Sequence, residues 1–280
     1  MRKSIDIETT INSGQVFLWN KINDYWVGVD GQDLLLLNQS PFMAKSSSNK
    51  INYFFREEDN LKKILSNISR DKIVERAVKR SPGLRLIRQD PFQCYISFIC
   101  SSNSSIQNIK LMLENLCKKF GAEHEFNGHK VSTFPRAEVL ANASMKDLID
   151  CRLGFRAKYV KGAAQAVNSG EIDFTLLKKT EYITCLETLK KIRGIGNKIA
   201  DCIMLFSIDK IESFPIDRWT QRILLKYYKR SFDNITEKPM TEKKYEKLHE
   251  EIVKYFGPYA GYAQQFLFKM ERDLNKKNWL

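Results

Sequence analysis

The chain places two oppositely charged residues, Lys198 and Asp217, close to a glycine-rich turn within the segment Leu189–Arg218. The turn is Gly-Ile-Gly, Lys198 follows its second glycine by two residues, and Asp217 stands two residues after a proline. A structural turn between helices requires neither charge. A lysine amine can act as a nucleophile, and a carboxylate can stabilise positive charge that develops during a reaction. The combination therefore indicates covalent catalysis.

Lys198 falls in the first turn of the helix that begins after the glycines, where a cation opposes the helix dipole. Cys202, four residues later, lies on the same helix face, and apolar residues dominate the rest of this helix. An amine at the edge of an apolar pocket loses hydration, which favours its neutral and nucleophilic form. A solvent-exposed lysine without a role is the simpler alternative.

Asp217 also has a simple explanation. It precedes the helical pattern RWTQRILLKYY, so its carboxylate can cap that helix without any further function. A carboxylate directed toward Lys198 would instead stabilise positive charge on a reacting group. The residues alone leave both alternatives open.

The glycine turn exposes backbone N–H groups at the start of the second helix. Those amides, with the positive end of the helix dipole, can hold a phosphate. Gly194 and Gly196 are therefore candidate phosphate contacts, and Lys190, Lys191 and Arg193 add positive charge beside them. The residue between the glycines is expected to point into the core. A plain helical hairpin uses glycine in the same way, so the turn alone does not decide its function.

The composition favours a polyanionic partner. The 280-residue chain has 46 lysine and arginine residues against 33 aspartate and glutamate residues, a formal net charge of +13. A surplus of this size indicates nucleic acid first and an anionic membrane second, with a lysine-rich surface as the plain alternative. The first residues do not resemble a secretory leader, and the uncharged stretch Pro91–Ile109 is too polar to cross a bilayer. We expect an intracellular protein without a membrane anchor.

The cysteines and histidines argue against a metal site. None of the six cysteines forms a C-x-x-C pair, and none comes after Cys202, so we expect no iron–sulfur cluster near the C-terminus. The three histidines lack metal-ligand spacing. We expect buried thiols and no catalytic metal or other cofactor.

The elements that must position these residues change type along the chain. Residues 1–84 predict an antiparallel sheet domain, with a strong signal for a tight hairpin at Asp30-Gly31. Helical periodicity begins near residue 57, and Ser81–Leu84 is a candidate hinge. Residues 85–280 predict a helical body almost throughout, with the helical hairpin at about 183–217. The expected fold class is α+β.

Several segments, in chain order, carry a family resemblance. The hairpin with Lys198, which leads into a proline-containing loop with Asp217, resembles the DNA glycosylase superfamily that includes endonuclease III. Further segments resemble the 8-oxoguanine DNA glycosylase/AP lyase of the eukaryotic type, namely SGQVFLW, RQDPFQCYISFICSSNSSI, LGFRAKYV, GNKIADCI and GPYAGYAQQFLF. They span nearly the whole chain, so the resemblance is specific. It implies an N-terminal antiparallel sheet packed on an all-α helix-hairpin-helix glycosylase body.

The resemblance implies a mechanism in which DNA is bent and the damaged nucleotide is extruded into a pocket. The residue matching Lys198 attacks the deoxyribose, expels the base and forms a Schiff base that supports β-elimination. The residue matching Asp217 orients the sugar and stabilises its charge. The backbone carbonyl at Gly14 is implied to read the N7–H that distinguishes 8-oxoguanine from guanine. Three side chains are implied to bind the base: Gln264 at its Watson–Crick edge, with Phe268 and Cys202 on its faces.

Other matched residues are implied to act on the rest of the duplex. Asn103 and Arg156 would fill the gap and contact the orphaned cytosine, and Phe155 would wedge at the neighbouring base step. Where the family has a second arginine on cytosine, this chain has Asn108, which predicts relaxed selectivity for the opposite base. Trp219 replaces a phosphate-contacting histidine, and Phe155 stands where tyrosine is common.

The predicted function is excision of 8-oxoguanine from duplex DNA with an associated AP-lyase step. We expect a monomer that needs no redox cofactor, although the hairpin carbonyls could hold a structural monovalent cation. Two alternatives stay open. A glycosylase for alkylated bases would rely on the aspartate, and superfamily members of that kind lack the lysine. A non-catalytic helix-hairpin-helix protein would bind DNA through phosphates only.

Overall fold

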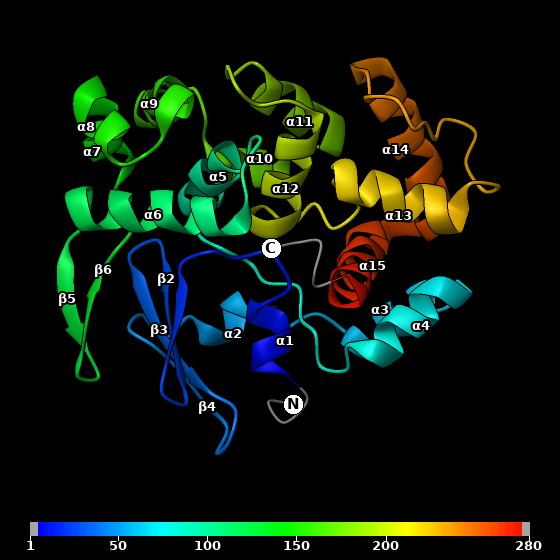
Figure 1. Ribbon diagram of the computed structural model, residues 1–280, viewed down its shortest axis with the longest axis horizontal. Coiled ribbons are helices and arrows are strands. Elements are labelled where there is room, and N and C mark those ends of the chain that lie inside the picture. The colour runs from blue at the N-terminus through cyan, green and yellow to red at the C-terminus, as the bar shows by residue number, and fades with distance from the viewer. Residues whose placement is uncertain (1–4, 276–280) are drawn as a thin grey trace.

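The N-terminal sheet has four antiparallel strands in sequence order, as seen in a computed structural model that describes residues 5–275 (Figure 1). The strands are β1 (Trp19–Ile22), β2 (Tyr25–Asp30), β3 (Asp33–Asn38) and β4 (Met43–Ser46). The β2–β3 connection turns at Gly31, which has a φ of +63°. The hairpin predicted at Asp30-Gly31 is therefore confirmed.

Both faces of this sheet are covered, which explains the unbroken apolar run of β3. Leu35 and Leu37 face a small core that also contains residues of α1 (Ile7–Ile11) and α2 (Ile51–Phe54). Leu34 belongs to the main core of the molecule instead. Successive side chains of a strand point to opposite faces, so a strand buried on both sides needs apolar residues at consecutive positions.

The remainder of the described chain is mostly helical and surrounds the main core. The sheet meets this body at α6 (Ile106–Phe120), where Nζ of Lys110 donates to the carbonyl of Trp19 at 2.8 Å. Helix α15 (Ala260–Leu274) returns to pack against α3 (Leu61–Ile68) and α4 (Lys72–Arg80) (Figure 1). The predicted class, an α+β protein with its sheet on a helical body, is confirmed. The helices are α3 (Leu61–Ile68), α4 (Lys72–Arg80), α5 (Pro91–Cys100), α6 (Ile106–Phe120), α7 (Ala137–Asn142), α8 (Met145–Asp150), α9 (Ala157–Asn168), α10 (Phe174–Lys179), α11 (Tyr182–Lys190), α12 (Asn197–Ser207), α13 (Arg218–Tyr228), α14 (Glu242–Phe256) and α15 (Ala260–Leu274), with 3₁₀ turns at Gly154–Arg156 and Gly257–Tyr259.

One segment of the helical body departs from the sequence prediction. Strands β5 (Glu123–Phe126) and β6 (His129–Ser132) form an antiparallel hairpin directly after α6. Asn127 and Gly128 at its tip both have positive φ, 51° and 80°, as a two-residue type I′ turn requires. The Asn-Gly pair is the sequence signal for this hairpin, but the polar residues around it lack the apolar alternation that marks a strand. None of the helices in residues 5–275 combines the length and the apolar character that spanning a lipid bilayer requires.

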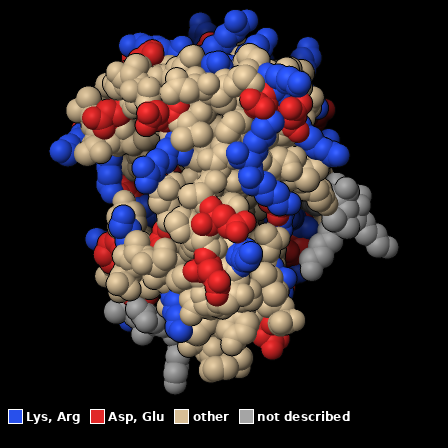
Figure 2. Space-filling model, turned by 90° about the vertical axis from the view of Figure 1, so that its left-hand side faces the viewer, with Lys and Arg blue, Asp and Glu red and all other residues tan. Residues whose placement is uncertain are grey.

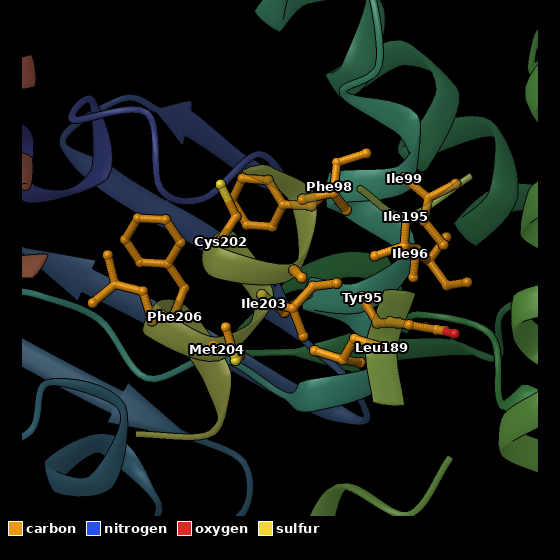
Figure 3. Close-up of a cluster of buried hydrophobic side chains, with 14 of the residues drawn as sticks. Tyr95, Ile96, Phe98, Ile99, Leu189, Ile195, Cys202, Ile203, Met204 and Phe206 are labelled. Atoms are coloured by element: carbon orange, nitrogen blue, oxygen red, sulfur yellow. The ribbon is translucent and has the colours of Figure 1, made fainter. Parts of the chain in front are cut away.

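Helices α5 and α12 pack against each other in the centre of the molecule. Figure 3 shows Phe98 of α5 and Phe206 of α12, whose rings stack with centroids 5.5 Å apart. Ile195, the residue between the two turn glycines, points into the same core and is 6% exposed, as its sequence position predicted. Close packing on both sides leaves α12 little freedom to shift, which matters because its first turn carries Lys198.

A charged cluster fixes the other end of α12. Asp209 lies just beyond this helix and forms ion pairs with Arg56 at 2.6 Å and with Arg88 at 2.7 Å. Burial alone would raise the pKa of Asp209, but the charge of Arg56 and the hydrogen bond from Arg88 hold that pKa below its usual value. Because Arg56 and Arg88 come from the N-terminal third of the chain, the cluster ties that region to the helix that carries the candidate nucleophile.

Candidate active site

The turn between α11 and α12 is built around two glycines with different constraints. Gly194 has a φ of +97°, and a Cβ at this position would lie 2.7 Å from Cγ of Tyr159, so a larger residue is excluded. Gly196 is the N-cap of α12, and nothing lies within 4 Å of where its Cβ would be. Among the described residues no side chain caps this helix. The first-turn amides are therefore open to an anion such as a DNA phosphate.

Lys198 lies half-buried in the first turn of α12. Its Nζ donates to Oγ of Ser101 at 3.1 Å and lies 5.5 Å from the centre of the Phe98 ring. Cys202, one turn further, is buried, and burial raises the pKa of its thiol to about 12 although the charge of Lys198 acts in the opposite direction. The thiol therefore stays neutral, which leaves the Lys198 amine as the candidate nucleophile on this helix face.

Asp217 is the N-cap of α13, and its Oδ1 accepts the N–H of Thr220 at 2.7 Å. The same residue lines the cavity that Lys198 lines. The two alternatives that the sequence left open are therefore compatible. The hydrogen bond that caps the helix also holds the carboxylate at the cavity wall.

A cavity of about 180 Å³ joins these groups. Aromatic rings and a few polar groups form its walls, which suits the flat heterocycle of a nucleobase. Every residue that was predicted to react or to bind the base lines it. The lining comprises Gly14, Phe17, Phe98, Ser101, Ser104, Ser105, Ile106, Ile109, Lys198, Cys202, Phe206, Pro215, Asp217, Trp219, Gln264, Gln265 and Phe268.

The predicted base-binding residues come from opposite ends of the chain. Gly14 has a φ of +90°, and a Cβ there would lie 3.1 Å from Cε1 of Phe268. Nε2 of Gln264 donates to Oγ1 of Thr220 at 3.3 Å, whereas its buried Oε1 has no hydrogen-bond partner in the described part of the chain. Buried polar atoms are normally paired, so this oxygen is an acceptor available to a ligand in the cavity.

The residues predicted to act on the rest of the duplex form a second group. Arg156 is 9% exposed, and its guanidinium donates to the carbonyls of Ser102 and Asn103, in each case at 3.0 Å. Asn103 is exposed with a φ of +50°. The ring of Phe155 is 54% exposed and lies 4.4 Å from the guanidinium. Arg156 thus stabilises the loop that contains Ser102 and Asn103, a role that was not predicted from the sequence.

A groove of about 1450 Å³ continues from the cavity across the starts of α12 and α13. Its lining includes Asn103 and Gly196, together with two arginines that were not predicted, Arg218 and Arg222. The guanidinium of Arg222 lies 4.7 Å from the centre of the Trp219 ring. In the view of Figure 2, Lys and Arg side chains gather at the upper end of the molecule. This positive charge is suited to the phosphate backbone of DNA.

Several residues of the site were not predicted from the sequence. Ser101, which binds the candidate nucleophile, lies in the motif RQDPFQCYISFICSSNSSI but was assigned no role. Phe98 and Phe206 were assigned no role from the sequence, yet both line the cavity. Arg218 and Arg222 stand four residues apart on α13, and this spacing is the signal that could have found them. Within residues 5–275 no three His, Cys, Asp or Glu side chains are placed to hold a metal ion.

Two family models together match most of the chain. The model described as HhH-GPD superfamily base excision DNA repair protein matches residues 96–252. The model described as the N-terminal domain of 8-oxoguanine DNA glycosylase matches residues 1–95.

Individual proteins are similar to this chain over nearly its whole length. N-glycosylase/DNA lyase OGG1 of Arabidopsis thaliana is 29% identical over 97% of this chain and 79% of its own. A solved structure of 8-oxoguanine glycosylase/lyase of Clostridium acetobutylicum contains duplex DNA with cytosine opposite 8-oxoG. Its sequence is 29% identical to this chain, and the TM-score is 0.86. The match covers 97% of this chain and 93% of that one. The structure of MBOgg1 with a low-affinity DNA ligand is 30% identical with a TM-score of 0.86 and covers 96% and 93% respectively.

Proposed function

Because this chain belongs to the HhH-GPD superfamily of base excision DNA repair proteins, we propose that it removes 8-oxoguanine from duplex DNA and then cleaves the strand as an AP lyase. The observation that carries the proposal is the single cavity in which Lys198 and Asp217 meet the candidate base-binding residues. The relatives that match nearly the whole chain are named as glycosylase/lyases, which supports the same two activities.

Lys198 is the proposed nucleophile. The lone pair of its amine attacks C1′ of the extruded deoxyribose, and the bond from C1′ to the base breaks. The base leaves with the electron pair of that bond and takes up the proton that the amine loses on attack. Opening of the sugar ring produces a Schiff base between Nζ and C1′. Removal of a C2′ proton then breaks the C3′–O bond, which is β-elimination on the 3′ side. The hydroxyl of Ser101, 3.1 Å from Nζ, orients the amine in the free protein.

Asp217 is the proposed electrostatic partner of this reaction. Its carboxylate stabilises the positive charge that develops on the sugar as the base departs. The hydrogen bond from the N–H of Thr220 holds the carboxylate in place before DNA binds. A charge that is already oriented needs no reorganisation when the transition state forms.

The walls of the cavity supply the proposed recognition of the damaged base. The carbonyl of Gly14 accepts the N7–H of 8-oxoguanine. The unpaired Oε1 of Gln264 accepts an N–H from the Watson–Crick edge. Phe268 and Cys202 pack against the faces of the ring, since both line the cavity.

The groove outside the cavity is the proposed duplex-binding surface. Asn103 and Arg156 fill the space that the extruded nucleotide leaves, and the exposed ring of Phe155 wedges at the neighbouring step. The backbone at Gly194 and Gly196 binds a phosphate. We propose that the protein acts on DNA as a monomer, without an iron–sulfur cluster and without a membrane partner.

Borohydride trapping tests the proposed function against both alternatives. Borohydride reduces a Schiff base to a stable amine, so incubation with duplex DNA that contains 8-oxoguanine is expected to give a covalent protein–DNA adduct. A non-catalytic DNA-binding protein and a glycosylase for alkylated bases would give none. Absence of the adduct, under conditions where the protein binds the duplex, would contradict the proposal.

Gly14→Ala is expected to reduce discrimination between 8-oxoguanine and guanine by about tenfold, the value of one hydrogen bond. Alanine is strained at a φ of +90°, and its methyl group would press on Phe268 at 3.1 Å. The measurement is the ratio of dissociation constants for the two duplexes. Gly128→Ala is the matched control, since Gly128 also has a positive φ, +80°, but lies in the β5–β6 hairpin with nothing within 4 Å. An unchanged ratio in Gly14→Ala would remove Gly14 from the reading of the base.

Asn108→Arg is expected to increase the preference for cytosine opposite 8-oxoguanine by about tenfold to a hundredfold, because a charged donor to a base edge is worth roughly 1–3 kcal/mol. The wild-type chain should correspondingly accept adenine, guanine and thymine opposite the lesion. Single-turnover excision against the four opposite bases measures this. Gln107→Arg, which adds the same charge at the neighbouring exposed position, is the control. A wild type that already prefers cytosine by more than about a hundredfold would contradict the inference from Asn108.

A further inference from the structure

A buried polar cluster lies beside the cavity, between α11, α12 and α14. Its centre is Asp201, which stands three residues after Lys198 on α12 and is 0% exposed. Tyr182 donates to its Oδ1 at 2.8 Å, and Tyr245 donates to its Oδ2. None of these three residues belongs to the described lining of the cavity, although Tyr245 lines the groove outside it. The proposed chemistry therefore leaves the cluster without a role.

The cluster also holds the backbone that leads to the catalytic carboxylate. The N–H of Phe214 donates to Nε2 of His249 at 3.2 Å, and the N–H of Ile216 donates to the hydroxyl of Tyr245 at 3.1 Å. Pro215, between them, has no N–H and lines the cavity instead. This short segment is thus held by side chains of α14 at two of its residues, and its middle residue faces the substrate.

The cluster is rigid because its groups support one another. The rings of Tyr182 and His249 stack with centroids 4.9 Å apart, and the ring of Tyr245 is parallel to that of His249 at 6.3 Å. Burial raises the pKa of Asp201, while the hydrogen bonds from the two tyrosines favour its ionised form. A buried network of satisfied hydrogen bonds resists displacement.

We propose that Asp201, Tyr245 and His249 are positioning residues for the base-excision step, an inference that rests on the proposed function. Asp201 is on the helix that carries Lys198, and Tyr245 links it to the N–H of the residue directly before Asp217. The cluster therefore sets the position of the carboxylate relative to the amine, although these two groups come from different elements. A displacement of a catalytic group by about 1 Å can cost roughly a hundredfold in rate.

Two tyrosine variants separate positioning from stability. Tyr245→Phe removes the hydroxyl that accepts the N–H of Ile216. Tyr182→Phe removes a hydroxyl that contacts the Asp201 carboxylate and Nε2 of His249, but that binds neither backbone amide directly. Tyr245→Phe is expected to lower single-turnover excision of 8-oxoguanine by about tenfold to a hundredfold with little change in DNA affinity. Tyr182→Phe should keep most of the excision rate. Thermal unfolding of both variants, measured in parallel, shows whether their losses of stability are similar.

His249 provides a second test if Tyr245→Phe does not fold. His249→Leu removes the acceptor for Phe214 N–H, whereas His249→Gln can restore an acceptor oxygen in its place. The leucine variant is expected to lose excision rate, and the glutamine variant to recover part of it at similar stability.

The outcomes distinguish this inference from the proposed function. A wild-type protein that excises no 8-oxoguanine contradicts the proposed function itself. If the wild type excises the base and a folded Tyr245→Phe variant excises it at the same rate, the positioning role is overturned. Equal losses of excision rate in Tyr245→Phe and Tyr182→Phe overturn the positioning role as well. The loss of rate would then result from lower stability of the fold and not from loss of the hydrogen bond to the N–H of Ile216.

Discussion

Lys198→Gln is expected to abolish the covalent adduct that borohydride traps between this protein and DNA containing 8-oxoguanine. Glutamine keeps a polar side chain at this position, but it has no amine with which to form a Schiff base. Excision is expected to fall by at least about 10³-fold, as when a catalytic unit loses its nucleophile. Strand cleavage should fall to background. Gel analysis of trapped adducts and single-turnover excision measure these effects, and titration of labelled duplex should show that binding is largely retained.

The matched control for this variant is Lys191→Gln. Lys191 is an exposed lysine in the same hairpin, outside the described lining of the cavity, so its loss removes one phosphate-directed charge. This control is expected to weaken DNA binding modestly and to form the adduct in full. If Lys198→Gln still forms the adduct, another amine acts as the nucleophile and the assignment of Lys198 is wrong.

Asp217→Asn is expected to bind damaged DNA but to lose about 10³-fold in the rate of base excision, the scale of one preorganised electrostatic contact in a transition state. Asparagine caps helices as well as aspartate does, so α13 should keep its N-terminal hydrogen bond from Thr220. The substitution therefore removes the negative charge with little change of structure. Single-turnover excision and thermal unfolding, measured on the same preparation, separate the two effects.

Asp173→Asn is the control for helix capping. Asp173 caps α10 through the N–H groups of Thr175 and Leu176 and is exposed, so its change to asparagine should leave excision at the wild-type rate. A loss below about tenfold in Asp217→Asn would reduce Asp217 to a helix cap, whose contribution is of order 1 kcal/mol. Lys198 would then need another group to stabilise the charge on the sugar.

Features that depend on residues close together in the chain could be predicted from the amino-acid sequence. The hairpin at Asp30-Gly31 results from the positive φ that its tight turn needs, and the cap at Asp217 results from a carboxylate directly before a helical pattern. Lys198 and Cys202 share a face because four residues are about one helical turn. The resemblance of ordered motifs also predicted which of these residues meet in the site, but it did so by analogy with a family.

Contacts between residues far apart in the chain became known from the folded structure. Gly14 and Phe268 stand at opposite ends of the chain, and their contact depends on how α15 packs against the N-terminal region. The bracing of the Asn103 loop by Arg156 likewise has no local signal. The link from Asp201 to the backbone before Asp217 passes through a tyrosine of a third helix. Such contacts depend on the packing of whole elements, and helical periodicity specifies which face is buried without specifying its partner.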